Sequence, residues 1–196
     1  MSVSPAPPIL LASTSPQRSA ILEQLGLPFD AVAPNYVEVD PPDGDAVELV
    51  RAHALGKARS VAATAGNRPV LGVDTAVTLG GHIYGKPADA TEAAAMLAAL
   101  AGHTHVVVSG LALITPGAEL VEHDSTRVTF RPLTARDLAA YVATREWEGR
   151  AGGYAIQGRG AALVEEVEGD YSNVVGLPVA LLVRLLAERL PGVYFG

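Results

Sequence analysis

Apolar and polar residues alternate along the chain in short blocks that predict strands and helices in turn. Residues 9–12 form an apolar run typical of a buried strand, and residues 17–25 place apolar side chains at helical spacing. Ser15 is a favourable N-cap for that helix, Pro16 suits its first position and Gly26 suits its end. The chain is therefore expected to open with a strand, a tight turn and a helix.

The same patterns continue along the chain, with hairpins inserted between the helices. Further strands are predicted at residues 29–39, 70–74 with an extended continuation at 76–79, 103–114, 120–130 and 161–167. Further helices are predicted at residues 45–65, 91–100, 134–144 and 178–190. Because turns at 80–81 and 115–117 interrupt the alternation of helix and strand, the predicted fold class is α/β with a mixed sheet.

No internal repeat, low-complexity tract or long linker divides the sequence. We therefore expect residues 1–196 to form a single domain, in which residues 41–44 (PPDG) are the best candidate for a hinge. With 49% hydrophobic and 18% charged residues, the chain is expected to be globular and long enough to bury a sizeable core.

The composition also excludes several classes of function. The sequence holds no Cys, which rules out disulfides, thiolate metal sites and cysteine nucleophiles. No apolar run reaches about 18 residues and no basic region precedes the first one, so neither a membrane span nor a secretory signal is expected. The cytoplasm is the expected location, without a membrane partner. A net charge of −7 argues against binding to a nucleic-acid polymer.

The basic residues are unevenly divided between the two types. Of the 14 basic side chains, only Lys57 and Lys86 are lysines. Codon bias accounts for an excess of Arg, but not for the two positions that kept Lys. Because a compact ammonium meets a phosphate differently from a planar guanidinium, both lysines are candidates for a phosphate site.

Ser13, Ser15 and Arg18 gather at the predicted start of the first helix. A helix N-terminus presents free backbone N–H groups and a partial positive charge, so this turn has the outline of an anion site. An ordinary N-cap beside a solvated Arg is the alternative interpretation.

A second glycine-containing stretch imitates a Walker A motif. Gly80, Gly85 and Lys86 have the spacing G-x-x-x-x-G-K, but Pro87 stands where that motif needs Ser or Thr. We therefore reject a P-loop, and Lys86 remains a candidate for a phosphate contact made from a loop.

Asp74 and Thr75 follow an apolar strand, at the place where α/β sheets often carry catalytic groups. A structural carboxylate satisfied by backbone donors is the alternative. The five His residues lack the spacing of a metal site, and no G-x-S-x-G elbow is present. Any metal is therefore expected on oxygen ligands such as Glu38 and Asp74, which suit Mg²⁺ or Mn²⁺.

The glycine-rich stretch at residues 149–160 is the last informative segment. Glycine lets a backbone approach a flat ligand closely, and Gln157 offers both a donor and an acceptor, as the edge of a nucleobase requires. Simple loop punctuation explains the glycines equally well.

Taken in order, these segments resemble the Maf family of nucleoside triphosphate pyrophosphatases. The resemblance runs from about residue 9 to residue 190 and rests on several ordered motifs. They are residues 11–18 (LASTSPQR), Glu38, residues 51–57, residues 71–75 (LGVDT), residues 85–87 (GKP), residues 154–158 (YAIQG) and residues 168–178. Both lysines fall on motif positions.

The resemblance implies hydrolysis of a nucleoside triphosphate between its α and β phosphates, with a divalent cation, Mg²⁺ or Mn²⁺. It also implies an inosine-triphosphatase-like fold with two lobes around a deep central cleft, and a possible homodimer. Arg18, Lys57 and Lys86 would then hold phosphates. Asp74 would be the general base or would position a metal-bound water, and Glu38 would share the cation. Ser13 would cradle phosphate oxygens.

Within the family, Thr75 and Gln157 resemble the subgroup that acts on dTTP and UTP. The chain departs from the usual family pattern at Gln17, where the first of two basic residues is usual, and at Gly149-Arg150, where Asp-Lys is common. Gln17 is therefore expected to contact the substrate and to influence base preference, and a broader range of nucleotides, including modified ones, is compatible with the pattern. A non-catalytic nucleotide-binding regulator of cell division is the alternative function.

Overall fold

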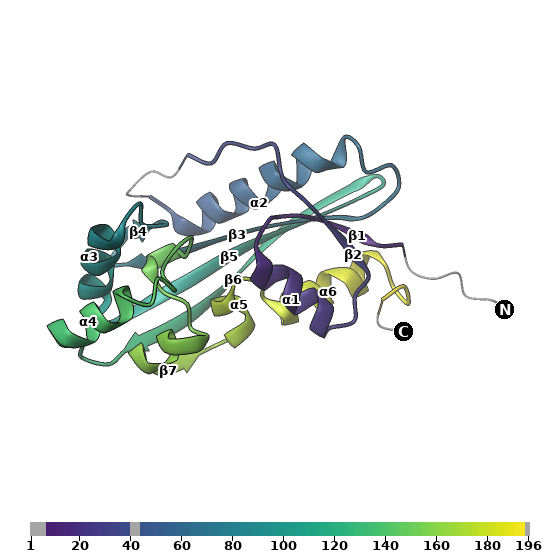
Figure 1. Cartoon of the computed structure of the whole chain (residues 1–196). Helices are drawn as coiled ribbons and strands as arrows, with labels where there is room; N and C mark the ends of the chain where they lie inside the picture. Colours follow the sequence, from purple (N-terminus) through teal and green to yellow (C-terminus); the bar gives the residue numbers. More distant parts are fainter. Residues whose placement is uncertain (1–6, 40–43, 195–196) are drawn as a thin grey trace.

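A mixed sheet forms the frame of the molecule (Figure 1). The computed structural model describes residues 7–39 and 44–194. Within them the strands are β1 (Ile9–Ala12), β2 (Phe29–Val32), β3 (Val70–Leu79), β4 (His82–Tyr84), β5 (Thr104–Thr115), β6 (Ala118–Phe130) and β7 (Val164–Glu168). They are ordered β2-β1-β3-β5-β6-β7, with β4 paired to β3. β1 is parallel to β2 and β3 and every other pair is antiparallel, so the predicted mixed α/β sheet is confirmed.

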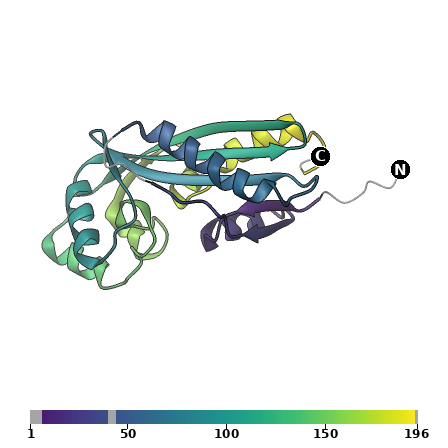
Figure 2. The same ribbon diagram turned by 90° about the horizontal axis from the view of Figure 1, so that it is seen from above.

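Helices cover both faces of this sheet (Figures 1 and 2). The helices of the described residues are α1 (Pro16–Gln24), α2 (Ala46–Ala62), α3 (Ala90–Leu100), α4 (Ala135–Val142), α5 (Tyr171–Val175) and α6 (Val179–Arg189). Short 3₁₀ turns add Ala151–Gly153 and Gly158–Leu163. None of the helices in these residues is long and apolar enough to cross a membrane.

Strand periodicity decides which helix packs on which face. In β1, Ile9 and Leu11 point into a core shared with α1 and α6, while Leu10 and Ala12 point into a second cluster under α2. We call the first cluster the main core. It is built mainly from Leu and Ile side chains, most of them in β1, α1, β3, β5 and α6.

Two glycines let α2 approach the sheet closely. A Cβ on Gly72 in β3 would lie 2.1 Å from the Ala54 carbonyl oxygen, and a Cβ on Gly110 in β5 would lie 2.3 Å from that of Val50. Any larger residue at either position would push the helix away from the strands. The close contact brings the residues of α2 over the middle of β3.

A third hydrophobic cluster, which we call the distal core, lies at the other end of the long strands. Val77, Phe130, Trp147, Tyr154 and Ile156 belong to it, together with residues of α3. β3, β5 and β6 contain 10, 12 and 13 residues and pass from the main core into the distal core (Figure 1). One continuous sheet therefore carries both cores.

Two local predictions were wrong, and one element was missed. The strand expected at 29–39 ends at Val32. Pro34, which lacks an N–H, follows, and residues 33–39 are extended without a strand partner in the described chain. The strand expected from residue 161 begins at Val164, because Gly158–Leu163 form a 3₁₀ turn. The short helix α5 was not predicted. The proposed hinge at 41–44 lies outside the described residues except for Gly44.

Candidate active site

A cavity of about 430 Å³ opens between the main core and the distal core. The β1–α1 turn and α5 contribute one part of its wall, and the glycine-rich stretch after α4 contributes another. Every site residue predicted from the sequence lines it. These residues are Ser13, Gln17, Arg18, Glu38, Lys57, Asp74, Thr75, Lys86 and Gln157. Segments far apart in the sequence therefore meet at one place.

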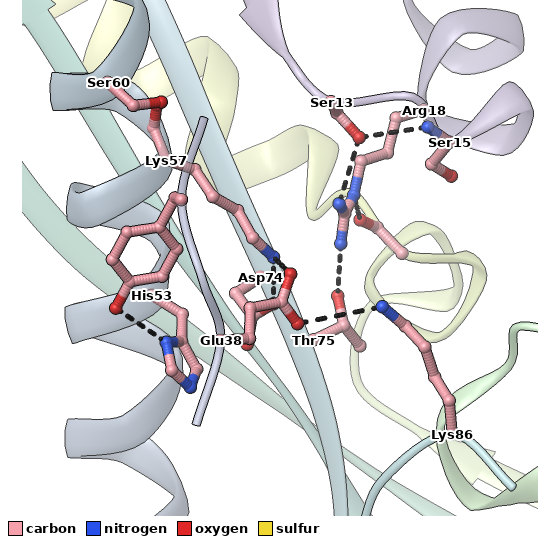
Figure 3. A network of polar contacts seen from close by, with 12 residues as sticks. Ser13, Ser15, Arg18, Glu38, His53, Lys57, Ser60, Asp74, Thr75 and Lys86 are labelled. Carbon is pink, nitrogen blue, oxygen red and sulfur yellow. Dashed lines mark hydrogen bonds and ion pairs between the residues drawn. The ribbon is translucent and has the colours of Figure 1, made fainter. Parts of the chain in front are cut away.

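Lys57 joins two carboxylates at the floor of the cavity (Figure 3). Its Nζ lies 2.5 Å from Asp74 Oδ1 and 2.7 Å from Glu38 Oε1. Lys57 is only 5% exposed and Asp74 only 7%, because α2 sits close against β3. Asp74 Oδ2 has no hydrogen-bond partner among the residues that the structure describes. One carboxylate oxygen is thus held while the other stays available.

Glu38 has an environment that favours its charged form. Burial acts to raise the pKa of this carboxyl, but the hydrogen bond and charge of Lys57, with the charges of Lys86 and His53, outweigh it. The pKa of Glu38 therefore lies below its ordinary value. Lys86 Nζ approaches Glu38 Oε2 at 3.7 Å and its side chain is 58% exposed, so this second lysine is free to turn toward a ligand.

Arg18 is fixed by neutral groups. Its Nε donates to the Gly176 carbonyl at 2.9 Å, and its terminal nitrogens donate to Ser13 Oγ and Thr75 Oγ1, each at 3.2 Å. Burial lowers the pKa of Arg18, although the charges of Asp74 and Glu38 oppose that shift. A guanidinium remains charged at neutral pH, and this one is bonded to dipoles, so its charge is available to an anion.

The turn before α1 keeps donors free. Ser13 Oγ accepts hydrogen bonds from Ser15 N and from Arg18, so its own hydroxyl hydrogen is left to donate. Ser15 occupies the N-cap position as predicted, but in the described structure its hydroxyl donates to Gln17 Oε1 at 3.1 Å and caps no helix N–H. The first N–H groups of α1 therefore remain for a ligand.

The comparisons with known proteins agree with this geometry. The family model for Maf-like proteins matches residues 8–189. The chain belongs to the Maf family. It is 49% identical over 186 residues to the dTTP/UTP pyrophosphatase of Nitratidesulfovibrio vulgaris, covering 94% of this chain and 89% of that protein. It is 45% identical over 181 residues to the enzyme of the same name from Deinococcus radiodurans, covering 92% of each.

Both Maf relatives are named for nucleotide substrates, dTTP and UTP. Gln157 lies on the distal side of this Maf protein's site, where its exposed side chain lines the cavity wall. Tyr154 also lines the wall, and its hydroxyl lies 2.8 Å from His105 Nε2 in the distal core. The contact between Tyr154 and His105 therefore anchors the segment that carries Gln157 to the distal core.

Sequence reasoning missed the groups that support this Maf site. Ser109 lies 2.8 Å from Thr75 Oγ1 across the β3–β5 pair, and Tyr36 OH lies 2.9 Å from His53 Nδ1. No spacing in the sequence joins these residues, since each pair forms only when strand register or helix packing is known. Arg150 was noted only as a departure from the family pattern, and it too lines the cavity.

The donor set fits a hard divalent cation. Glu38 and Asp74 are brought within reach of one Lys57 ammonium, and each has a second carboxylate oxygen. The described residues contain no group of three or more His, Cys, Asp or Glu side chains that could hold a metal. Mg²⁺ commonly uses one or two carboxylates and takes its other ligands from water and substrate phosphates, so two carboxylates suffice.

Proposed function

We propose that this protein hydrolyses nucleoside triphosphates between the α and β phosphates, releasing a nucleoside monophosphate and pyrophosphate. We propose dTTP and UTP as substrates, or a broader range that includes modified nucleotides. The names of relatives that match over nearly the whole chain support this. The observation that carries the proposal is the buried Lys57, which holds Asp74 and Glu38 in a cavity that also contains Arg18 and Lys86.

Asp74 is the general base of the proposed reaction. A water oxygen attacks the α phosphorus, the bond from that phosphorus to the bridging oxygen breaks, and pyrophosphate leaves with the electron pair. Lys57 holds Asp74 through Oδ1, so Oδ2 is free to accept the proton of the attacking water. A buried base held by an ion pair needs little reorganisation when the reaction occurs.

The phosphates are bound by groups on three segments. Ser13 faces them from the β1–α1 turn, and Arg18 faces them from the first turn of α1, beside the free N–H groups of that helix. Lys86 faces them from the loop after β4, and its contact with Glu38 is long enough to exchange for a phosphate. These cations stabilise pyrophosphate as its charge develops.

A divalent cation, Mg²⁺ or Mn²⁺, is the proposed cofactor. Glu38 would hold it through the oxygen that Lys57 does not use, and the negative charge of Asp74 would help to attract it while Oδ2 stays available as the base. When bound, the cation would neutralise phosphate charge during the displacement. We assign no further metal ligand in the protein.

Thr75, Gln17 and Gln157 are the proposed specificity residues. Thr75 is bonded to Arg18 and so links recognition to phosphate binding. Gln17 presents a neutral amide at the helix start, and Gln157 presents one from the distal side. An amide on each side can read the donor and acceptor pattern of a pyrimidine edge.

Further features of the whole protein complete the proposal. We propose that residues 1–196 form one domain of the inosine-triphosphatase-like type, whose two lobes meet at the cavity. Supporting this, β3, β5 and β6 run through both cores. We also propose a homodimer and a cytoplasmic location, where nucleotides are found, and no role for a membrane or nucleic-acid polymer.

Product analysis in ¹⁸O-labelled water tests the proposal. The protein is incubated with a panel of nucleoside triphosphates, deoxynucleoside triphosphates and modified nucleotides, with Mg²⁺ or Mn²⁺. We expect pyrophosphate as the product, with the label in the monophosphate, because attack is at the α phosphorus. Release of orthophosphate would contradict the reaction type. Nucleotide binding without any turnover would instead favour the non-catalytic regulator.

A further inference from the structure

Arg150 stands at the distal side of the cavity and lines its wall. It directly precedes the 3₁₀ turn Ala151–Gly153, and the N–H of Gly152 in that turn donates to the Gly85 carbonyl at 3.0 Å. Gly85 is the neighbour of Lys86. The backbone segments that carry Arg150 and Lys86 are therefore tied together, while Arg18 comes from the main-core side.

The Arg150 guanidinium has no protein partner. Across the described part of the chain it makes no hydrogen bond and no ion pair, and its Nε is buried without an acceptor. By contrast, Arg59, Arg131 and Arg145 each reach a carboxylate within 2.9 Å. A buried N–H without an acceptor is costly, and Arg150 combines such a group with a position on the cavity wall, so its side chain calls for a ligand.

Neither acidic side chain of this segment fills that role. Glu148, which also lines the cavity, is paired with Arg145 at 2.6 Å. Glu146 attracts Arg150, but its carboxylate is used by the backbone N–H groups of Arg159 and Gly160, at 3.0 and 3.3 Å. Burial lowers the pKa of Arg150, while Tyr141 and Glu146 oppose that shift. The guanidinium therefore gives up no protein bond when it turns toward an anion in the cavity.

The charges that line the cavity leave room for this contact. Lys57 is already shared by Glu38 and Asp74, and Lys86 contacts Glu38. Arg18 and Arg150 are the two lining cations without a carboxylate ion pair in the described residues. A triphosphate carries several negative charges in a protein whose net charge is −7, so it needs both.

We propose that Arg150 binds the β and γ phosphates of the substrate from the distal side of the cavity, a role that rests on the proposed function. The planar guanidinium offers two parallel N–H groups to phosphate oxygens, which a lysine at the same place does not. Arg150 and Arg18 hold the leaving pyrophosphate between the two cores.

The test is the affinity of the protein for inorganic pyrophosphate, measured by calorimetry with Mg²⁺ present. Arg150→Gln should weaken pyrophosphate binding about tenfold to a hundredfold, because it removes a charge-assisted pair. Arg150→Lys keeps the charge without the fork and should lose about three- to tenfold. Arg159→Gln is the matched control, since Arg159 lies on the same segment but does not line the cavity, and it should stay within about twofold of wild type.

Several results would overturn the assignment. They are wild-type pyrophosphate affinity in Arg150→Gln, an equal loss in Arg159→Gln, or no pyrophosphate binding by the wild-type protein. Weakened binding of uridine with unchanged binding of pyrophosphate would also overturn it, since that places Arg150 at the base. Arg150→Lys decides the question if the Gln variant does not fold.

The outcome is separable from that of the proposed function. If the wild-type protein released orthophosphate from nucleotides, the proposed reaction would fail, yet the pyrophosphate titration would still decide whether Arg150 binds phosphates.

Discussion

Among the single residues, Lys57 has the most consequential surroundings. Lys57 is one of only two lysines, and Asp74 follows an apolar strand. These two features were enough to select Lys57 and Asp74 as candidates. That Lys57 bridges Asp74 and Glu38 could not be predicted. The bridge depends on how closely α2 approaches β3, and this distance is set by Gly72 and Gly110.

The two lysines should respond differently to the same substitution. Lys57→Met leaves two carboxylates without their shared cation, so the free energy of unfolding should fall by about 3 kcal/mol. Lys86→Met removes an exposed contact and should cost less than about 1 kcal/mol while raising KM for the nucleotide. Urea unfolding of both variants measures the difference, and equal losses of stability would contradict the bridging role of Lys57.

His105 should make the protein acid-sensitive. Burial lowers the pKa of His105 from 6.5 to about 4, because the ring is enclosed by Tyr154 and Phe130. Between those two values the unfolded chain binds more protons than the folded one, so stability falls as pH drops from 6.5 toward 4. This single group accounts for a loss of up to about 3 kcal/mol over that range.

The His105→Gln variant checks this assignment. It should lose less stability than wild type over the acid range, when each protein is referred to its own value at pH 8. Urea unfolding at a series of pH values gives both curves. Parallel curves for the two proteins would show that His105 does not titrate as described.

At the scale of elements, periodicity predicted most of the helices and strands. The long strands at 103–114 and 120–130 and the helix at 91–100 were placed within a few residues. The segment 33–39 was not, because an alternating pattern cannot show whether an extended segment finds a strand partner. There the side chain of Tyr36 lies over Gly56 of α2, and Glu38 turns toward Lys57.

Gly56 should be required for residues 33–39 to pack against α2. A Cβ at Gly56 would lie 2.2 Å from the Tyr36 ring, so Gly56→Ala should displace Tyr36 and, with it, Glu38. Helix propensity alone predicts the opposite sign, a gain of about 1 kcal/mol. We expect Gly56→Ala to destabilise the protein and to raise the Mg²⁺ concentration needed for half-maximal activity.

A second background separates the two effects. In Tyr36→Ala protein the clash is gone, so adding Gly56→Ala should now stabilise. Urea unfolding of the four proteins in this cycle gives the coupling. If Gly56→Ala stabilised the protein in the wild-type background, the expected clash with Tyr36 would be wrong.

At the scale of the whole molecule, a polyanion site is built in an acidic protein. The net charge of −7 argued against binding to extended polyanions, but it could not show that four cations line one cavity. Their convergence depends on strands that cross from the main core to the distal core. Tertiary structure is needed for this, since Arg18 and Arg150 are distant in the sequence.

Asp74, held by Lys57, is the proposed base for hydrolysis at the α phosphorus. The most direct measurement is the rate of pyrophosphate release from UTP or dTTP by Asp74→Asn, compared with wild type at saturating substrate and Mg²⁺. We predict a fall of about 10²- to 10⁴-fold with nucleotide binding still measurable, because the amide cannot accept the proton. A rate within about threefold of wild type would contradict the account.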